Sequence, residues 1–154
     1  MRKSRTLRVA AFFAMMAMLA VMLQLQLGGT ANAAPGDNIL ASAADDGTQG
    51  NGFSTAPRIS TDGRYVTFAS ESDNLDPLDT DTIRDIYRKD LQTGDIALVS
   101  VAADGTTKGN QGSTVATMSA DGRYVIFRSQ ADNLVLADTS TDNDIFWYSP
   151  DKIE

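Results

Sequence analysis

The feature that most constrains this chain is an internal repeat. Residues 59–70 return 59 residues later as residues 118–129, with the same Asp-Gly-Arg-Tyr-Val stretch and with Phe and Ser at the same later places. Three downstream elements recur at that offset: Asp73-Asn74-Leu75 as Asp132-Asn133-Leu134, Asp79-Thr80 as Asp138-Thr139, and Asp85-Ile86 as Asp144-Ile145. Self-similarity at a fixed period is the signature of a repeat architecture, in which each unit buries its apolar surface against a neighbouring unit.

Each repeat predicts β-structure. Asp62-Gly63 and Asp121-Gly122 lie between apolar runs, which is the strongest short-range hairpin signal, because glycine accepts the positive φ of a tight turn. The β-branched and aromatic residues after each turn predict strands, and their near-continuous apolar character predicts burial on both faces. Further strands are predicted at residues 85–88, 96–101 and 144–148, and no stretch beyond residue 33 has helical periodicity. The sequence therefore predicts an all-β fold.

These residues carry a family resemblance. The stretch Ser-x-Asp-Gly-Arg-Tyr-Val-x-Phe-x-Ser, followed by Asp-Asn-Leu, Asp-Thr and Asp-Ile-aromatic, resembles the TolB-type β-propeller repeat, a relative of the WD-repeat blade. The resemblance implies a propeller of four-stranded blades that usually acts as a binding scaffold, and sometimes gates an attached hydrolase domain. We accordingly expect two four-stranded antiparallel sheets in residues 34–154, with blade 1 at about 53–102 and blade 2 at about 112–154.

Two blades make an incomplete propeller, because closed propellers have four to eight. Residues 38–43 resemble the strand that the second repeat lacks, so we expect this segment to complete blade 2. Three interpretations remain open: a truncated gene product, a homo-oligomer whose subunits complete a ring, and an open two-sheet domain. The exposed sheet edges of an open domain favour aggregation.

The N-terminal residues predict a secretory signal peptide. Four basic residues precede an apolar run from Val9 to Leu23, and the small-x-small site Ala31-Asn32-Ala33 follows. We expect cleavage after Ala33, which makes residues 1–33 the leader and the product secreted or periplasmic, with no membrane attachment afterwards. The alternative is an uncleaved membrane anchor, because the apolar stretch approaches spanning length when it is counted through Leu27.

Composition narrows the function. The chain has no cysteine and no histidine, so it has no disulfide framework, thiol nucleophile or Ser-His-Asp triad. Beyond residue 33, nine basic residues stand against 20 acidic ones, a formal net charge of −11 that argues against nucleic-acid binding. With no catalytic constellation in sight, we expect a non-enzymatic scaffold that binds a protein, a peptide or a cell-envelope component. The alternative is a regulatory propeller portion of a larger hydrolase or peptidase.

The best candidate site is the Asp-rich loop that each repeat carries before its third strand. Oxygen side chains at alternate positions can wrap a hard cation such as Ca²⁺, the one cofactor that the sequence suggests. The candidate ligands are Asp79, Asp81 and Asp85 in the first repeat, and Asp138, Asp142 and Asp144 in the second. Against calcium, the glycine and the closing glutamate of a calcium loop are missing. We therefore favour the interpretation that these aspartates form Asx turns that fix the loop and lead into the strand, with calcium as the alternative.

The run Ile145-Phe146-Trp147-Tyr148 is a second feature with two interpretations. Aromatic residues in this density suit a surface that binds sugars or peptides, and they equally suit a core strand. The corresponding strand of the first repeat is more polar, Ile86-Tyr87-Arg88-Lys89. Because the tryptophan is single, we favour packing in the core over a binding surface for this run.

Overall fold

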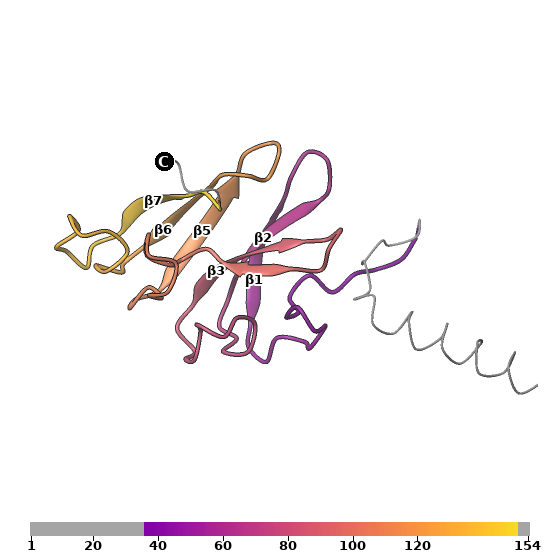
Figure 1. Ribbon diagram of the computed structural model, residues 1–154, viewed down its shortest axis with the longest axis horizontal. Coiled ribbons are helices and arrows are strands. Elements are labelled where there is room, and N and C mark those ends of the chain that lie inside the picture. Colours follow the sequence, from indigo (N-terminus) through magenta and orange to yellow (C-terminus); the bar gives the residue numbers. More distant parts are fainter. Residues whose placement is uncertain (1–35, 151–154) are drawn as a thin grey trace, which may run out of the picture. The chain divides into compact units, whose positions relative to one another are not determined.

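The computed structural model of the chain describes residues 36–150, which contain seven antiparallel strands (Figure 1). The all-β prediction is confirmed for these residues, and no helix that could cross a membrane occurs among them. The predicted leader, residues 1–33, and its cleavage site lie outside the described residues.

The strands form two sheets, one for each repeat. The first sheet has the order β1 (Ser54–Ile59), β2 (Tyr65–Ser70), β3 (Asp85–Asp90) and β4 (Ile96–Leu98), and the second has the order β5 (Ser113–Met118), β6 (Val125–Ser129) and β7 (Asp144–Tyr148). The strand register repeats as well. Ser54 lies opposite Ser70 in the first sheet, as Ser113 lies opposite Ser129 in the second.

The Asp-Gly hairpin between β1 and β2 shows why local sequence fixes this register. The Ser60 hydroxyl donates a hydrogen bond to Asp62 (2.6 Å) and accepts one from the backbone N–H of Tyr65 (2.9 Å). Gly63 follows with a φ of +74°, in the region that favours glycine. The hairpin between β5 and β6 makes the same two side-chain bonds, so both predicted turns are confirmed.

The second sheet has three strands among the described residues, where four were expected. Residues 38–43 form no strand there, and Ala43 bridges to Gln49 within its own turn. This segment lies against the first sheet instead, because the Lys89 ammonium on β3 donates a hydrogen bond to the Ala43 carbonyl (2.7 Å). The expectation of a second four-stranded sheet is therefore wrong for the described chain.

Strands β2 and β3 of the first sheet are buried on both faces, as the sequence predicts for β2. One face, which includes Ala69 and Ile86, packs against Val125 and Phe127 of the second sheet. The opposite face carries a separate cluster: Val66, Phe68, Leu75, Tyr87, Ile96 and Leu98, with Ala41 packed against it. In β6, by contrast, buried and exposed residues alternate, so burial on both faces is wrong for the second sheet.

Candidate functional site

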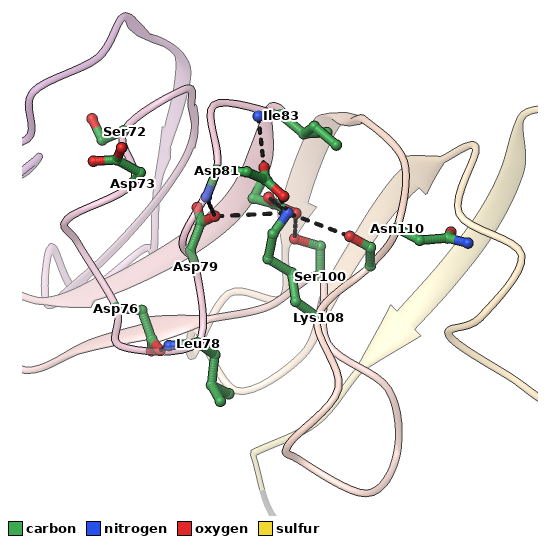
Figure 2. A network of polar contacts seen from close by, with 12 residues as sticks. Ser72, Asp73, Asp76, Leu78, Asp79, Asp81, Ile83, Ser100, Lys108 and Asn110 are labelled. Atoms are coloured by element: carbon green, nitrogen blue, oxygen red, sulfur yellow. Dashed lines mark hydrogen bonds and ion pairs between the residues drawn. The ribbon is translucent and has the colours of Figure 1, made fainter.

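The loop between β2 and β3 brings Asp79, Asp81 and Asp85 together, as the sequence predicts. Their carboxylate oxygens lie within 4.8 Å of one another (Figure 2). The loop also contains the Asx turns of the favoured interpretation, because Asp81 accepts a hydrogen bond from the backbone N–H of Ile83 (2.8 Å). Turn formation and clustering are thus compatible in one loop.

The side chain among these carboxylates is Lys108, which the sequence alone did not single out. Its ammonium nitrogen lies 2.7 Å from Asp85, 3.2 Å from Asp81 and 3.7 Å from Asp79 (Figure 2). Lys108 belongs to the segment between β4 and β5, which leads into the second repeat. The chain itself therefore supplies a cation where the calcium hypothesis puts a metal ion.

Burial governs the electrostatics of this cluster. The side chains of Asp79 and Asp85 are fully buried, and that of Lys108 is nearly so. Burial raises the pKa of Asp85 to about 6, against the opposing effect of the Lys108 and Ser100 hydrogen bonds. Burial lowers the pKa of Lys108, but its bonds with Asp85 outweigh that effect and leave the pKa raised. Asp85 and Lys108 are therefore both ionised at neutral pH.

Asp79 also accepts a hydrogen bond from an uncharged side chain, that of Tyr87. The Tyr87 hydroxyl on β3 donates a hydrogen bond to Asp79 Oδ2, and burial raises the pKa of Tyr87, which keeps that hydroxyl protonated. Burial also raises the pKa of Asp79, and the Tyr87 hydrogen bond opposes that change. Every carboxylate of the cluster thus has a partner, which is what burial of charge requires.

The same cluster joins the two repeats. Ser100, just beyond β4, donates a hydrogen bond to Asp85 (2.6 Å) and accepts one from the backbone N–H of Ile86 (3.0 Å). Lys108 holds the following segment to the same carboxylate. Asp85, on β3, is thus bonded both to Ser100, at the end of the first repeat, and to Lys108, in the segment that leads into the second repeat.

The second repeat does not reproduce this cluster. Asp138, Asp142 and Asp144 are not brought together as a three-carboxylate group among the described residues. Position 140, the counterpart of Asp81, is a serine, and Phe146 stands where the first repeat has Tyr87. The Oδ2 oxygen of Asp138 is buried and accepts no hydrogen bond from the residues that the structure describes. The missing tyrosine hydroxyl explains this unpartnered oxygen.

The aromatic run of β7 divides between core and surface. Phe146 stacks on Phe127, with ring centroids 5.6 Å apart, and packs against the core between the sheets. Trp147 points to the other face, where it stacks on Tyr124 at 5.5 Å. Ile145 lies outward as well, with 70% of its surface exposed. Core packing is therefore confirmed for Phe146, whereas Ile145 and Trp147 lie exposed, where a binding surface would have them.

A cleft opens between β4 and β7, with a volume of about 640 Å³. Its lining is mostly apolar and includes Val99, Phe127, Leu134 and Phe146. The cleft is in the size range of ligand pockets, but it has few of the converging polar groups that fix the orientation of a small molecule. The cleft lies beside β7, where the second sheet has no fourth strand among the described residues.

No protein-family model matches the chain, and no curated protein matches its sequence significantly. The residues and their geometry are therefore the basis of the functional assignment.

Proposed function

We propose that this chain is an exported, non-catalytic module of TolB-type propeller repeats that binds another polypeptide through the outward face of its second sheet. This face, called the outer face below, consists of the β6 and β7 side chains that point away from the first sheet, together with Tyr124: Tyr124, Ile126, Arg128, Ile145 and Trp147.

The observation that carries the proposal is the different burial of matched positions. Thr67 and Ile86 of the first sheet are fully buried, since that face of the first sheet packs against the second. Their counterparts in the second sheet, Ile126 and Ile145, are 45% and 70% exposed. In a propeller, the sheet face that carries these positions is covered by the sheet of the next blade. An apolar face that stays exposed marks an interaction site.

Two further features support a binding role without catalysis. Asp79 and Asp85 are the buried carboxylates of the described chain that have raised pKa values, and both are already bonded to groups of the protein itself, Asp79 to the Tyr87 hydroxyl and Asp85 to Lys108. The four-stranded antiparallel first sheet is also compatible with a propeller blade.

The proposal is tested by placing a photo-crosslinking amino acid at Ile145 in the producing cell. We expect crosslinks to a defined polypeptide, identified by mass spectrometry. The matched control is the same amino acid at Leu136, which is fully exposed on the loop before β7 and outside the outer face. Equal crosslinking at both positions, or none to any polypeptide at Ile145, would contradict the proposal.

The single tryptophan provides a second readout with purified components. Trp147 is the only tryptophan in the chain, and it lies half-exposed on the outer face. A partner that covers this face shifts tryptophan emission to shorter wavelength and protects it from acrylamide quenching. Export is checked separately by the mass of the recovered product, which we expect to begin at Ala34.

A further inference from the structure

Among the residues that the structure describes, strand β7 lacks one of the two neighbours that its counterpart β3 has. In the first sheet β3 is flanked by β2 and β4, whereas β7 is an edge strand of the second. The chain nevertheless contains a counterpart of β4 and the residues that follow it. Gly50 N–H donates a hydrogen bond to the Ser42 carbonyl, as Gly109 N–H does to the Ser100 carbonyl, both at 2.9 Å. Residues 38–43 therefore precede the same turn as residues 96–101.

Residues 38–43 and the second sheet, which contains β7, lie on opposite sides of the first sheet. Ala41 packs against the face of that sheet that carries Phe68 and Tyr87. The second sheet packs against the other face, which carries Ala69 and Ile86. With the first sheet between them, residues 38–43 do not reach β7 of their own chain.

We propose that residues 38–43 of a second copy of this chain add to β7 as its fourth strand, so that copies associate head to tail. The contact continues the interface between the two repeats of one chain, because the same positions meet in the same register. It names the partner of the outer face and therefore rests on the proposed function. Strand addition to a sheet edge is a recurrent mode of recognition.

The apolar side chains fit this register. In the first sheet Leu98 lies opposite Tyr87 and packs in the cluster that contains Phe68. By the same register, Leu40 of the second copy falls opposite Phe146 and beside Phe127. Both phenylalanines line the cleft between β4 and β7. Leu40 is half-exposed in the single chain, so the side chain that fits the cleft is available for it.

The backbone contacts have an equally direct template. Val99 N–H donates a hydrogen bond to the Ile86 carbonyl (2.7 Å), and the Ser100 hydroxyl next to it binds Asp85. The counterparts are Ala41 and Ser42 of the second copy, which meet Ile145 and Asp144. The residue types that make these contacts, a small apolar residue followed by serine and an aspartate followed by isoleucine, are present at both ends.

The matched positions at the two junctions, one within the chain and one between copies, have the same formal charge. Within the chain, three carboxylates and the Lys108 ammonium give a formal charge of −2. At the corresponding positions of the junction between copies, Gln49 replaces Lys108 and Ser140 replaces Asp81, which leaves Asp138 and Asp144, again −2. Asp142, whose counterpart is Ile83, is a further carboxylate of this loop outside the matched positions. Lys108 lies 3.7 Å from Asp79 Oδ1, so by the same template the Gln49 amide brings N–H donors to the Oδ1 side of the Asp138 carboxylate.

The hairpins show the same complementarity. Thr61 N–H donates a hydrogen bond to the Ala120 carbonyl (2.8 Å), and the ring of Tyr65 packs so closely on Gly122 that a Cβ there would overlap it. At Gly63, the counterpart of Gly122, nothing lies within 4 Å of such a position. Tyr124, the counterpart of Tyr65, is exposed on the outer face. Within one chain, Tyr65 and Gly122 are in contact with each other. Their counterparts, Tyr124 and Gly63, remain available for the same contact with another copy.

Because the two contacting surfaces differ, the association is heterologous, and it forms rings if the rotation closes and filaments if it does not. The test is sedimentation velocity of the exported chain from about 1 to about 100 µM. We expect the weight-average mass to rise with concentration. L40D should weaken this association at least about tenfold, because a carboxylate enters an apolar cleft. L136D adds the same charge at an exposed loop position and should leave it unchanged.

A disulfide test reports the register directly, since the chain has no cysteine of its own. The double variant I39C/W147C is designed on Ala97 and Arg88, which are paired in the first sheet. Under mild oxidation it should give a ladder of dimers, trimers and larger species. I39C alone and W147C alone can form at most dimers. I39C/L136C shows how much of a ladder arises from random collision.

The outcomes separate this proposal from the proposed function. A wild-type chain that stays a monodisperse monomer at about 100 µM overturns head-to-tail association. So does an I39C/L136C ladder as strong as that of I39C/W147C. If the chain is monomeric and Ile145 still crosslinks to a different polypeptide, the association fails while the binding function stands. Far-UV circular dichroism of L40D confirms that its loss of association is not a loss of fold.

Discussion

The two Asp-rich loops have closely related sequences and different structures. In the first repeat, Asp79 and Asp85 are buried and fully partnered, and Lys108 lies among the carboxylates. In the second repeat, Asp144 is exposed and the Oδ2 oxygen of Asp138 has no hydrogen bond within the described chain. The difference does not arise in the loops themselves. It arises because the first loop is completed by the repeat that follows it, and the described chain offers the second loop no such neighbour.

Removing the Lys108 ammonium tests most directly whether the first loop depends on the repeat that follows it. K108M leaves fully buried carboxylates without their cation, so we expect a loss of about 3–5 kcal/mol in the free energy of unfolding. The matched change Q49M, at the counterpart position, should cost less than about 1 kcal/mol. Urea unfolding followed by circular dichroism measures both. Equal losses at positions 108 and 49 would show that the first loop does not depend on its lysine.

A double variant tests whether the charge at the two junctions is matched. D81S/K108Q gives the first junction the residues that stand at the corresponding positions of the second, Ser140 and Gln49. The serine removes one of the carboxylates that the lysine neutralises, so the double variant should be more stable than K108Q alone by about 1 kcal/mol. If the two changes are additive, the charges at Asp81 and Lys108 are not coupled.

The hairpins and the strand positions could be predicted from the sequence because their causes are local. Ser60, Asp62 and Gly63 make their own turn, whichever sheet they belong to. Burial depends on what packs against a strand, so near-identical strand sequences gave the right answer for β2 and the wrong one for β6. No pattern within the second repeat shows that its outer face is uncovered.

The candidate site was predicted in part for a similar reason. Alternating aspartates placed Asp79, Asp81 and Asp85 in one loop, and the structure brings them together. Lys108 was missed because it lies 23 residues beyond Asp85, in the segment that leads to the next repeat. Alignment of the two repeats did contain a signal, namely that Lys108 corresponds to Gln49 and Asp81 to Ser140. Two compensating changes of charge indicate a contact between the two positions.

The pH dependence of stability should distinguish the two loops next. The folded-state pKa of Asp85, about 6, lies above its ordinary value of 3.8 because of burial. The native state therefore binds more protons than the unfolded state between these values, and stability falls as the pH rises from about 4 to about 6. The full effect is at most about 3 kcal/mol.

The variant D85N removes this titration, so its unfolding free energy should decline less than that of the wild type over that range. The decline that remains comes from Asp79, whose pKa burial also raises. D144N changes the matched, exposed position of the second loop and serves as the control, with the wild-type slope retained. Chemical unfolding at half-unit steps from pH 4 to pH 7 measures all three proteins. A D85N profile parallel to the wild type would mean that Asp85 is not the group responsible.

The tyrosine hydroxyl can be removed from the first repeat and added to the second at matched positions, 87 and 146. Y87F removes the donor to buried Asp79, which should cost about 1–3 kcal/mol because the carboxylate oxygen is left unsatisfied. F146Y adds the hydroxyl that the second loop lacks, at the counterpart position beside Asp138. We expect F146Y to stabilise by about 1 kcal/mol, as one net hydrogen bond does. Thermal unfolding gives both values, and changes of the same sign would contradict the proposed equivalence.

The smallest expected effect is that of calcium. An ion in the first loop has to displace the Lys108 ammonium, which already lies 2.7 Å from Asp85 and 3.2 Å from Asp81. The second loop does not bring three carboxylates together among the described residues. A cation that binds only the native state raises its stability in proportion to its occupancy, so with neither loop ready to hold Ca²⁺, millimolar CaCl₂ should raise Tm by less than about 1 °C. A chelator-reversible rise of several degrees would show instead that Ca²⁺ displaces the lysine. Repeating the titration with D81N and with D142N, one in each loop, would then identify which loop binds it.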